Sequence, residues 1–411
     1  MGKHFYYLWG SISSGKLAMS LYTMTITLLI FTITNSATFA SLVMLIYVIG
    51  KIVSSFIFPF VTEKIPLKKI LSFSLLAQLI HMLLIIYVFN DDGLLHTTLK
   101  LMIIYMLIAF TGFTDGFVSP SRMSLIPESV EEKALGKANS LISTTDQTFA
   151  LLGWSIGTVA INIYGSNSIL IVCIILLILS ILSSLQIKAT TIKKSTKRPS
   201  LDIMKEGWVI LFSKKNHMRT ITMMDILEGI ASGIWIGGIT LVFVHEVLKK
   251  GEQWWGFINS GYFVGSIIGG MLIAVLSTRL EKYLTKGIVI GSFFVSLFVL
   301  LYAMNTTAWI ALLLVVLMGP FYQLRDISQQ TYIQRNVDGL AKLYAAKDNL
   351  YYIVFALSVF LSGLISDYIS VVYVYYFAFI LYFISSIAAA FTFRRESKIN
   401  KNYDAMNDVN N

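Results

Sequence analysis

The sequence predicts an all-α membrane protein that crosses the bilayer many times, and three observations lead to this prediction. Of its 411 residues, 56% are hydrophobic and only 13% are charged, whereas soluble proteins carry about 25% charged residues. The charged residues are clustered, and the apolar runs between the clusters approach the roughly 20 residues that span a bilayer. The Lys and Arg residues behind the net charge of +10 fall mostly in alternate connecting segments. A polytopic helical protein accounts for all three observations.

Twelve apolar runs are long enough to be membrane spans. In chain order the expected spans are Phe5–Ile33, Ala40–Thr62, Ile70–Phe89, Leu99–Val118, Asn139–Ile163, Ser168–Ile187, Thr220–Val244, Trp254–Ser277, Gly287–Met304, Trp309–Leu324, Tyr344–Ser366 and Val371–Phe393. Polar residues interrupt the first and the fifth, so we expect these two to score poorly on a hydropathy scan.

The distribution of basic residues predicts that both ends of the chain are cytoplasmic. If the N-terminus is inside, 27 of the 32 Lys and Arg residues fall in cytoplasmic segments, as the positive-inside rule requires. Both ends on one side require an even number of spans, which favours twelve over eleven or thirteen. The positive net charge then follows from membrane topology, and we expect no nucleic-acid partner because no soluble basic domain is present.

The longest polar interruption divides the spans into two sets of six. We expect an N-terminal six-helix bundle at 1–187, a cytoplasmic central loop at 188–219, a C-terminal six-helix bundle at 220–393 and a cytoplasmic polar tail at 394–411. The stretch from Leu201 to Ser213 is amphipathic, which predicts a short helix at the membrane surface. The sequences "ALGKAN" (Ala134–Asn139) and "GLAKLY" (Gly339–Tyr344) are a weak sign of internal duplication.

Five segments carry a resemblance to a known family. They read "FYYLWG" from Phe5, "TNSATFASLVMLIY" from Thr34, "SPSRMSLIPESVEEKALGKANSL" from Ser119, "DIMKEGWVILFSKKNHMR" from Asp202 and "WWGFINSGYFVGSIIGG" from Trp254. The chain resembles the major facilitator superfamily, and within it the branch of macrolide-efflux proteins and enterobactin-exporter-like carriers. This resemblance implies two rocking six-helix bundles, with the first, fourth, seventh and tenth spans lining a central cavity between them.

The chain also departs from the family's motifs. In "PFVTEKIPLKK", Pro59 replaces a glycine of the signature after the second span, and Leu67 replaces a base. Thr111 stands where the fourth span often has an arginine, and Gly153-Trp154 replaces the Gly-Pro of the antiporter signature. These motifs therefore do not by themselves imply antiport.

Six of the ionisable side chains within the expected spans are candidates for proton coupling or charge pairing, because a charge inside a span costs about 2.5–3.5 kcal/mol by insertion scales. They are Lys16, Lys51, Asp115, Asp146, Asp225 and Glu228. Asp225 and Glu228 are three residues apart and share one helix face, and Lys16 lies roughly 16 Å into its span. We predict that Lys16 pairs with Glu228 across the two bundles. A carboxylate that alternates between a basic partner and an apolar site would load and release a proton.

Structural roles compete with this interpretation. Asp225 is close enough to the start of its span to be a solvated acid favoured by the helix dipole. Asp146 could lie at the membrane interface, and Asp115 could form a structural salt bridge. Glu63, Lys64, Lys68, Arg325, Asp326 and Asp348 are expected to form a cytoplasmic gate network.

Aromatic side chains supply an adaptable apolar surface with a few polar groups, which suits amphipathic ligands. The expected cavity-lining set is Trp9, Tyr22, Trp235, Phe321, Tyr322 and Tyr351, although some of these rings would face lipid instead. Tyr373, Tyr375 and Tyr376 resemble an interfacial belt. Glycines recur every four residues from Gly229 to Gly237 and from Gly261 to Gly269, which predicts close helix packing.

Together with the resemblance, these features imply a proton-coupled secondary exporter of a small amphipathic molecule, either a drug or macrolide or an endogenous siderophore. An inward permease is the alternative in the same class, and a membrane sensor without turnover is the alternative in another. An enzyme is not expected, because the five His residues are scattered. The single cysteine, Cys173, makes a Cys-based metal site improbable, and no cofactor is expected. The expected setting is a bacterial plasma membrane, with a monomeric chain.

Overall fold

The computed structural model describes residues 1–34, 37–90, 97–187, 200–235 and 237–409, and within these ranges the chain is helical without strands. The helices are α1 (Lys3–Thr34), α2 (Ala37–Thr62), α3 (Leu67–Phe89), α4 (Thr97–Ser129), α5 (Leu135–Tyr164), α6 (Ser166–Leu185), α7 (Ser200–Leu211), α8 (Met218–Ala231), α9 (Gly237–Glu246), α10 (Glu252–Leu280), α11 (Leu284–Ala303), α12 (Ala308–Asn336), α13 (Leu340–Tyr368) and α14 (Val371–Val409).

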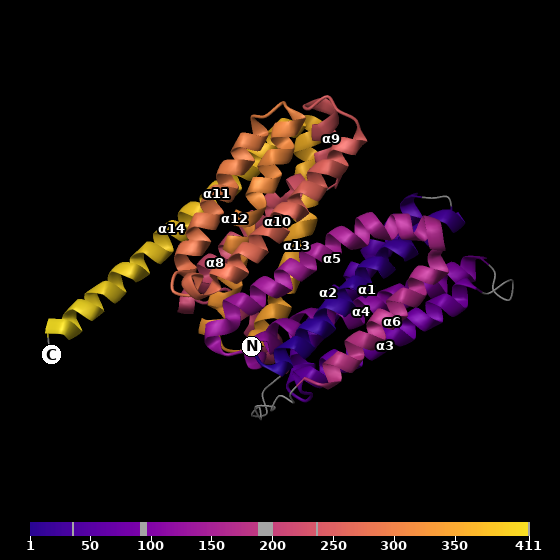
Figure 1. Cartoon of the computed structure of the whole chain (residues 1–411), viewed down its shortest axis with the longest axis horizontal. Helices are drawn as coiled ribbons and strands as arrows, with labels where there is room; N and C mark the ends of the chain where they lie inside the picture. The colour runs from indigo at the N-terminus through magenta and orange to yellow at the C-terminus, as the bar shows by residue number, and fades with distance from the viewer. Residues whose placement is uncertain (35–36, 91–96, 188–199, 236, 410–411) are drawn as a thin grey trace. The chain divides into compact units, whose positions relative to one another are not determined.

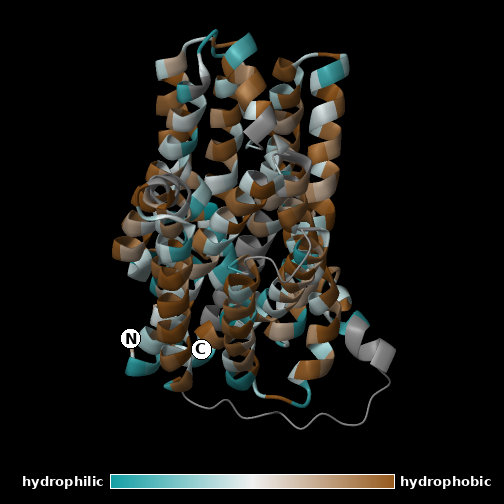
Figure 2. Ribbon diagram, turned by 90° about the vertical axis from the view of Figure 1, so that its right-hand side faces the viewer, coloured by the Kyte–Doolittle hydropathy of each residue, from teal (hydrophilic) through white to brown (hydrophobic). Residues whose placement is uncertain are grey.

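Ten helices in the described part of the chain are long and apolar enough to cross a membrane, and hydrophobic residues run along their length (Figure 2). A bent pair, Lys215–Trp235 with Ile239–Glu246, would make an eleventh span. The expectation that the first span would score poorly is wrong, because Lys3–Thr34 reaches a mean hydropathy of 1.8. The fifth, α5, is not among the ten, as its polar residues predict.

The predicted seventh span, Thr220–Val244, is not one continuous helix. The helix α8 ends at Ala231, a short 3-10 turn covers Ser232–Trp235, and α9 begins at Gly237. The two parts meet at an angle of 50°. Several glycines fall around this break, and glycine is a poor helix former that commonly accompanies sharp kinks.

Other helices run past their predicted ends. The predicted span Leu99–Val118 belongs to α4, which continues through Pro120 and Pro127 to Ser129. The predicted span Trp309–Leu324 belongs to α12, which continues to Asn336. The expected surface helix corresponds to α7, while 188–199 of the central loop lie outside the described residues. The expected polar tail continues as part of α14 as far as Val409.

The chain divides into two compact units. Unit 1 comprises Met1–Ala138, Thr145–Val209 and Asp338–Asn349, and unit 2 comprises Asn139–Thr144, Ile210–Val337 and Leu350–Asn411. The main division lies in the predicted central loop, but α5 and α13 each contribute residues to both units. The α5 residues Asn139–Thr144 belong to unit 2, and contacts of Asn139 explain this. Its amide donates to Thr331 and to Gln334 of α12.

In unit 1, α1 packs against α6, α2 and α4, and α3 packs against α4 and α6 (Figure 1). The helices α2 and α4 approach each other very closely. A Cβ on Gly112 would collide with the backbone of Tyr47, and a Cβ on Gly50 would collide with the carbonyl of Ala109. Only glycine allows the two backbones to come so near, and this crossing sets the distance between Tyr47, Lys51 and the residues of α4.

In unit 2, α12 packs against α10 and α11, and α14 packs against α8 and α11. The glycine spacing predicted close packing, and this is confirmed on two helices. Gly265 of α10 lies against the backbone of Val316 of α12. Gly229 and Gly233 lie against α13, where a Cβ on Gly229 would come within 2.5 Å of Val354. The described glycines of both series therefore lie at helix contacts.

Candidate functional site

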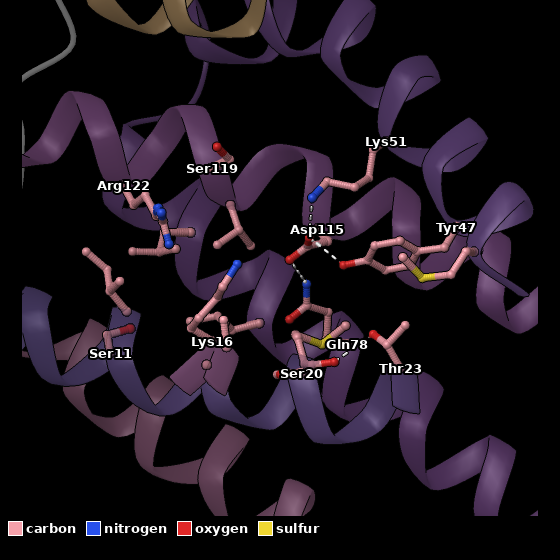
Figure 3. Close-up of a pocket in the computed structure, with 18 residues that line it drawn as sticks. Ser11, Lys16, Ser20, Thr23, Tyr47, Lys51, Gln78, Asp115, Ser119 and Arg122 are labelled. Atoms are coloured by element: carbon pink, nitrogen blue, oxygen red, sulfur yellow. Dashed lines mark hydrogen bonds and ion pairs between the residues drawn. The ribbon is translucent and has the colours of Figure 1, made fainter. Parts of the chain in front are cut away.

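A cavity of about 300 Å³ lies within unit 1, among α1, α2, α3, α4 and the α5 residue Ala150 (Figure 3). Besides Lys16 of α1, the helices α2, α3 and α4 each contribute charged or amide side chains to its lining. The polar lining residues are Ser11, Lys16, Ser20, Thr23, Tyr47, Lys51, Gln78, Asp115, Ser119 and Arg122. Apolar side chains including Ile12, Met19, Leu71 and Leu75 complete it. The cavity is thus part polar and part apolar.

Asp115 is the most firmly held charge in this cavity. Its carboxylate accepts a hydrogen bond of 2.6 Å from the Tyr47 hydroxyl and one of 3.1 Å from the Gln78 amide. Lys51 Nζ lies 2.8 Å from the same carboxylate. Three donors from α2 and α3 therefore satisfy Asp115 (Figure 3). Lys51 and Asp115 were both predicted as intramembrane charges, and the structure brings them together as a salt bridge.

A second pair joins Arg122 and Asp146, whose nearest atoms are 2.6 Å apart. Asp146 was predicted as a candidate, but Arg122 was not, because it was assigned to the loop after the fourth span. The missed signal was its spacing from Asp115. Seven residues make about two helical turns, so Asp115 and Arg122 share a face once α4 continues past Pro120.

Lys16 projects from α1 toward the cavity (Figure 3). The residue is exposed and lines the cavity. Among the described residues, its ammonium group has no carboxylate within ion-pair distance. The predicted contact with Glu228 would join residues of different units and stays a prediction.

Unit 2 holds a different cluster, centred on Arg325 of α12. Its guanidinium lies 3.0 Å from a carboxylate oxygen of Asp225 and 2.9 Å from one of Glu228. Asp326 lies farther away, at 3.9 Å. The three-residue spacing of Asp225 and Glu228 predicted that they share a face, and both do face Arg325 from α8.

Polar side chains complete this cluster from neighbouring helices. The Gln329 amide donates to Asp225 over 2.8 Å. The Ser385 hydroxyl of α14 donates to Glu228 over 2.6 Å, and Ser292 of α11 donates to the same oxygen over 3.4 Å. Sequence reasoning missed Gln329 and Ser385, since a lone amide or hydroxyl in an apolar helix gives no distinctive signal.

The residues expected to form a cytoplasmic gate are found in both units. Glu63 pairs with Lys342 over 3.0 Å, and Lys342 also pairs with Glu206 of α7 over 2.7 Å. Lys68 donates to the carbonyl of Leu185, while Lys64 is exposed. Arg325 and Asp326 belong to the cluster in unit 2.

Asp348, the last of the expected gate residues, lies in unit 1. It interacts electrostatically with Lys51 and Arg122, although it does not itself line the cavity. Three of the predicted gate residues, Glu63, Arg325 and Asp326, thus take part in ion pairs, and the gate itself stays a prediction.

The predicted aromatic residues are also divided. Trp9 donates to Thr145 over 3.0 Å, and Tyr22 is fully buried; neither lines the cavity of unit 1. Tyr351 is 57% exposed. In unit 2, ring contacts join six aromatic residues of several helices into a ring cluster, namely Trp235, Phe243, Tyr262, Tyr302, Tyr322 and Tyr375. Phe321 contacts Phe294 and Phe298 in a separate group. The belt assignment of Tyr375 is wrong, since this ring is completely buried.

No group of three or more His, Cys, Asp or Glu side chains in the described residues is placed to hold a metal ion. Apart from Lys16, the charged side chains that line the cavity of unit 1 and those of the Arg325 cluster instead form hydrogen bonds and ion pairs with other side chains. Such groups can bind a charged ligand or a proton.

Comparisons with known proteins agree with the helical architecture. A profile of the Major Facilitator Superfamily matches residues 8–346. The uncharacterized MFS-type transporter YfmI of Bacillus subtilis is 38% identical over 409 residues, which cover 98% of this chain and 99% of that protein. A second B. subtilis protein, the uncharacterized MFS-type transporter YjbB, is 29% identical over 79% of this chain and 78% of its own length.

Solved structures share the fold at low sequence identity. A bacterial homologue of the iron transporter ferroportin in an outward-facing state has a TM-score of 0.77 and 12% identity, covering 95% of this chain and 99% of that one. The human organic anion transporter MFSD10 has a TM-score of 0.74 and 8% identity, covering 95% and 100%. The E. coli fucose:proton symporter FucP has a TM-score of 0.73 and 12% identity, covering 94% and 98%. The chain belongs to the Major Facilitator Superfamily, a family of membrane transporters.

Proposed function

We propose that the chain is a proton-coupled secondary exporter of a small amphipathic molecule. The observation that supports this most directly is the cluster of Asp225 and Glu228 around Arg325. Carboxylates are rare in membrane spans because they are costly there, and they mark proton or substrate pathways. A single guanidinium facing two such groups is a suitable place to exchange a proton.

The surroundings of Glu228 suit it to be the proton carrier. Asp225 lies on the same helix as Glu228, and Arg325 and Asp326 face Glu228 from α12. Hydroxyl groups of α11 and α14 donate hydrogen bonds to Glu228. Like charges close together favour protonation of one carboxylate, and the nearby guanidinium favours the ionised form. Separating Glu228 from Arg325 would favour uptake of a proton, and reforming the pair would favour its release. The predicted partner Lys16 would take part in such an exchange.

We further propose twelve spans with both ends of the chain in the cytoplasm. The proposal counts α5 and the bent pair of α8 and α9 along with the ten apolar helices. It is supported by the bias of the Lys and Arg residues, since reversing the topology would place 27 of them outside. A bacterial plasma membrane is the proposed location, and the proposed form is a monomer.

The proposed direction and substrate follow from the resemblance to the macrolide-efflux and enterobactin-exporter-like branch. A drug, a macrolide or an endogenous siderophore would each offer an apolar body with polar groups. The ring cluster of unit 2 provides matching apolar surface. Profiling metabolites inside and outside a deletion strain, with and without iron starvation, would identify the class. A siderophore retained inside the cells would indicate that the substrate is a siderophore. Altered sensitivity to macrolides or dyes alone would indicate that the substrate is a drug.

Transport assays on everted vesicles test the proton coupling. Vesicles containing the wild-type protein should release protons when the substrate found by profiling is added, as reported by an internal pH-sensitive dye. Glu228→Gln should abolish this signal, because an amide cannot carry the proton. The matched control is Glu246→Gln, since Glu246 is exposed at the end of α9. Unchanged transport and unchanged pH dependence in Glu228→Gln would exclude this carboxylate from the mechanism.

A further inference from the structure

The cavity of unit 1 has a lining carboxylate that is already paired and, unlike the Arg325 cluster of unit 2, a lysine that faces the open space. Its carboxylate, Asp115, already receives Lys51, Tyr47 and Gln78. Its guanidinium, Arg122, is paired with Asp146. The remaining charged lining group is Lys16, which projects into the open space and has no carboxylate within ion-pair distance among the described residues.

The charges around the cavity also favour an anion over a cation. Three cations, Lys16, Lys51 and Arg122, line it, against one lining carboxylate. Asp146 and Asp348 interact with these cations but do not line the cavity. A cationic ligand would meet three cationic side chains and one lining carboxylate, and Asp115 would have to lose its present hydrogen-bond donors to bind it. An anionic ligand meets an ammonium group that is ready to bind it.

The rest of the lining fits an apolar body. Ile12, Met19 and Leu75 present hydrocarbon to the cavity, and the hydroxyls of Ser20 and Thr23 lie on the same helix as Lys16. Small-molecule sites combine such an apolar surface with a few polar groups that fix orientation. A volume of about 300 Å³ is within the range of such sites.

We infer that this cavity binds the anionic group of an amphipathic substrate, with the Lys16 ammonium as its counter-ion. The inference rests on the proposed transport function and narrows its substrate to amphipathic anions, such as carboxylates. Lipophilic cations, which a general drug exporter would accept, are disfavoured at this site.

The test uses the purified full-length protein in lipid nanodiscs and three probes of equal size. They are 2-naphthoate, 2-naphthylmethylammonium and 2-naphthalenemethanol, which are anionic, cationic and neutral at pH 7.5. Binding is measured by calorimetry, with empty nanodiscs subtracted to remove partition into lipid. The anion should bind at least about tenfold more tightly than the other two, as one charge-assisted hydrogen bond predicts.

Variants assign the preference to Lys16. Lys16→Gln should weaken naphthoate binding about tenfold or more and leave the neutral probe unchanged. Lys16→Arg should keep the preference, and Lys64→Gln, at an exposed lysine, should have no effect. Thermal unfolding of each variant separates loss of the site from loss of folding.

Three outcomes would overturn the inference. They are equal affinity for the anion and the cation, an anion preference that survives Lys16→Gln in folded protein, and no binding of any probe at millimolar concentration. The assay uses no proton gradient and no Glu228 variant. It can therefore fail while proton-coupled transport is upheld, and it can succeed while proton coupling is disproved.

Discussion

Two clusters in this protein have the same charge arrangement, a single cation between two carboxylates, but differ in residue type and burial. In unit 2, Arg325 lies between Asp225 and Glu228, with side-chain exposures of 7%, 16% and 11%. In unit 1, Lys342 lies between Glu63 and Glu206, with exposures of 17%, 16% and 34%. The distances are similar, so proximity alone does not distinguish them.

The two clusters differ in how far water can hydrate a carboxylate after its cation is removed. If its cation is removed, a carboxylate in the Arg325 cluster stays largely desolvated, and an unpaired buried charge costs several kcal/mol. In the Lys342 cluster, Glu206 is 34% exposed and can recover part of its hydration, and exposed pairs contribute about 0–1 kcal/mol. The residue type fits this difference. The guanidinium offers a rigid fork that can meet two carboxylates at once, whereas an ammonium is a compact point charge.

The largest expected effect comes from removing the buried cation. Arg325→Gln should destabilise the fold by about 3–5 kcal/mol, because Asp225 and Glu228 would then face each other without compensation. Unfolding by SDS in mixed micelles, followed by circular dichroism, measures the change. The triple variant with Asp225→Asn and Glu228→Gln should recover most of the loss, since no charge remains buried. A stability within 1 kcal/mol of the wild type for Arg325→Gln alone would contradict the comparison.

A smaller effect is expected when the positive charge at position 325 is kept but the forked guanidinium group is replaced. Arg325→Lys should cost about 1.5–3 kcal/mol, the contribution of one hydrogen bond to a charged group, because an ammonium cannot reproduce both contacts. The reciprocal change, Lys342→Arg, is the matched control and should alter stability by less than about 0.5 kcal/mol. The same SDS titration measures both. Equal losses in the two variants would mean that burial, and not the shape of the cation, sets the difference.

Much of the architecture could be predicted from the sequence, because apolar length and basic-residue bias are direct consequences of crossing a bilayer. The ends of the helices could not. The predicted tenth span stopped at Leu324 because Arg325 and Asp326 follow it, yet α12 continues to Asn336. Hydropathy cannot distinguish a polar residue that has left the membrane from one buried against another helix. In α12 the buried polar residues include Gln323, Ser328 and Gln329.

The candidate sites were predictable to a similar degree. Asp225, Glu228, Lys51 and Asp115 could be identified because an ionisable residue inside an apolar run is costly and therefore informative. Their partners could not be assigned, since pairing depends on which helix faces reach one another in three dimensions. Arg325 shows this most clearly, because it was expected in a gate and its contacts with Asp225 and Glu228 were not predicted.

The smallest effect is expected from the more exposed cation. Lys342→Gln should lower stability by about 1 kcal/mol or less, because Glu206 keeps access to water. This loss should shrink further in high salt, since the Debye length falls from about 10 Å at 0.1 M to about 3 Å at 1 M. The loss caused by Arg325→Gln should persist there, because buried charges are screened much less. The two variants are compared by SDS titration at both salt concentrations. If the salt dependence were the same for both, water access would not be what separates the clusters, and the differing shapes of the cations would have to explain it.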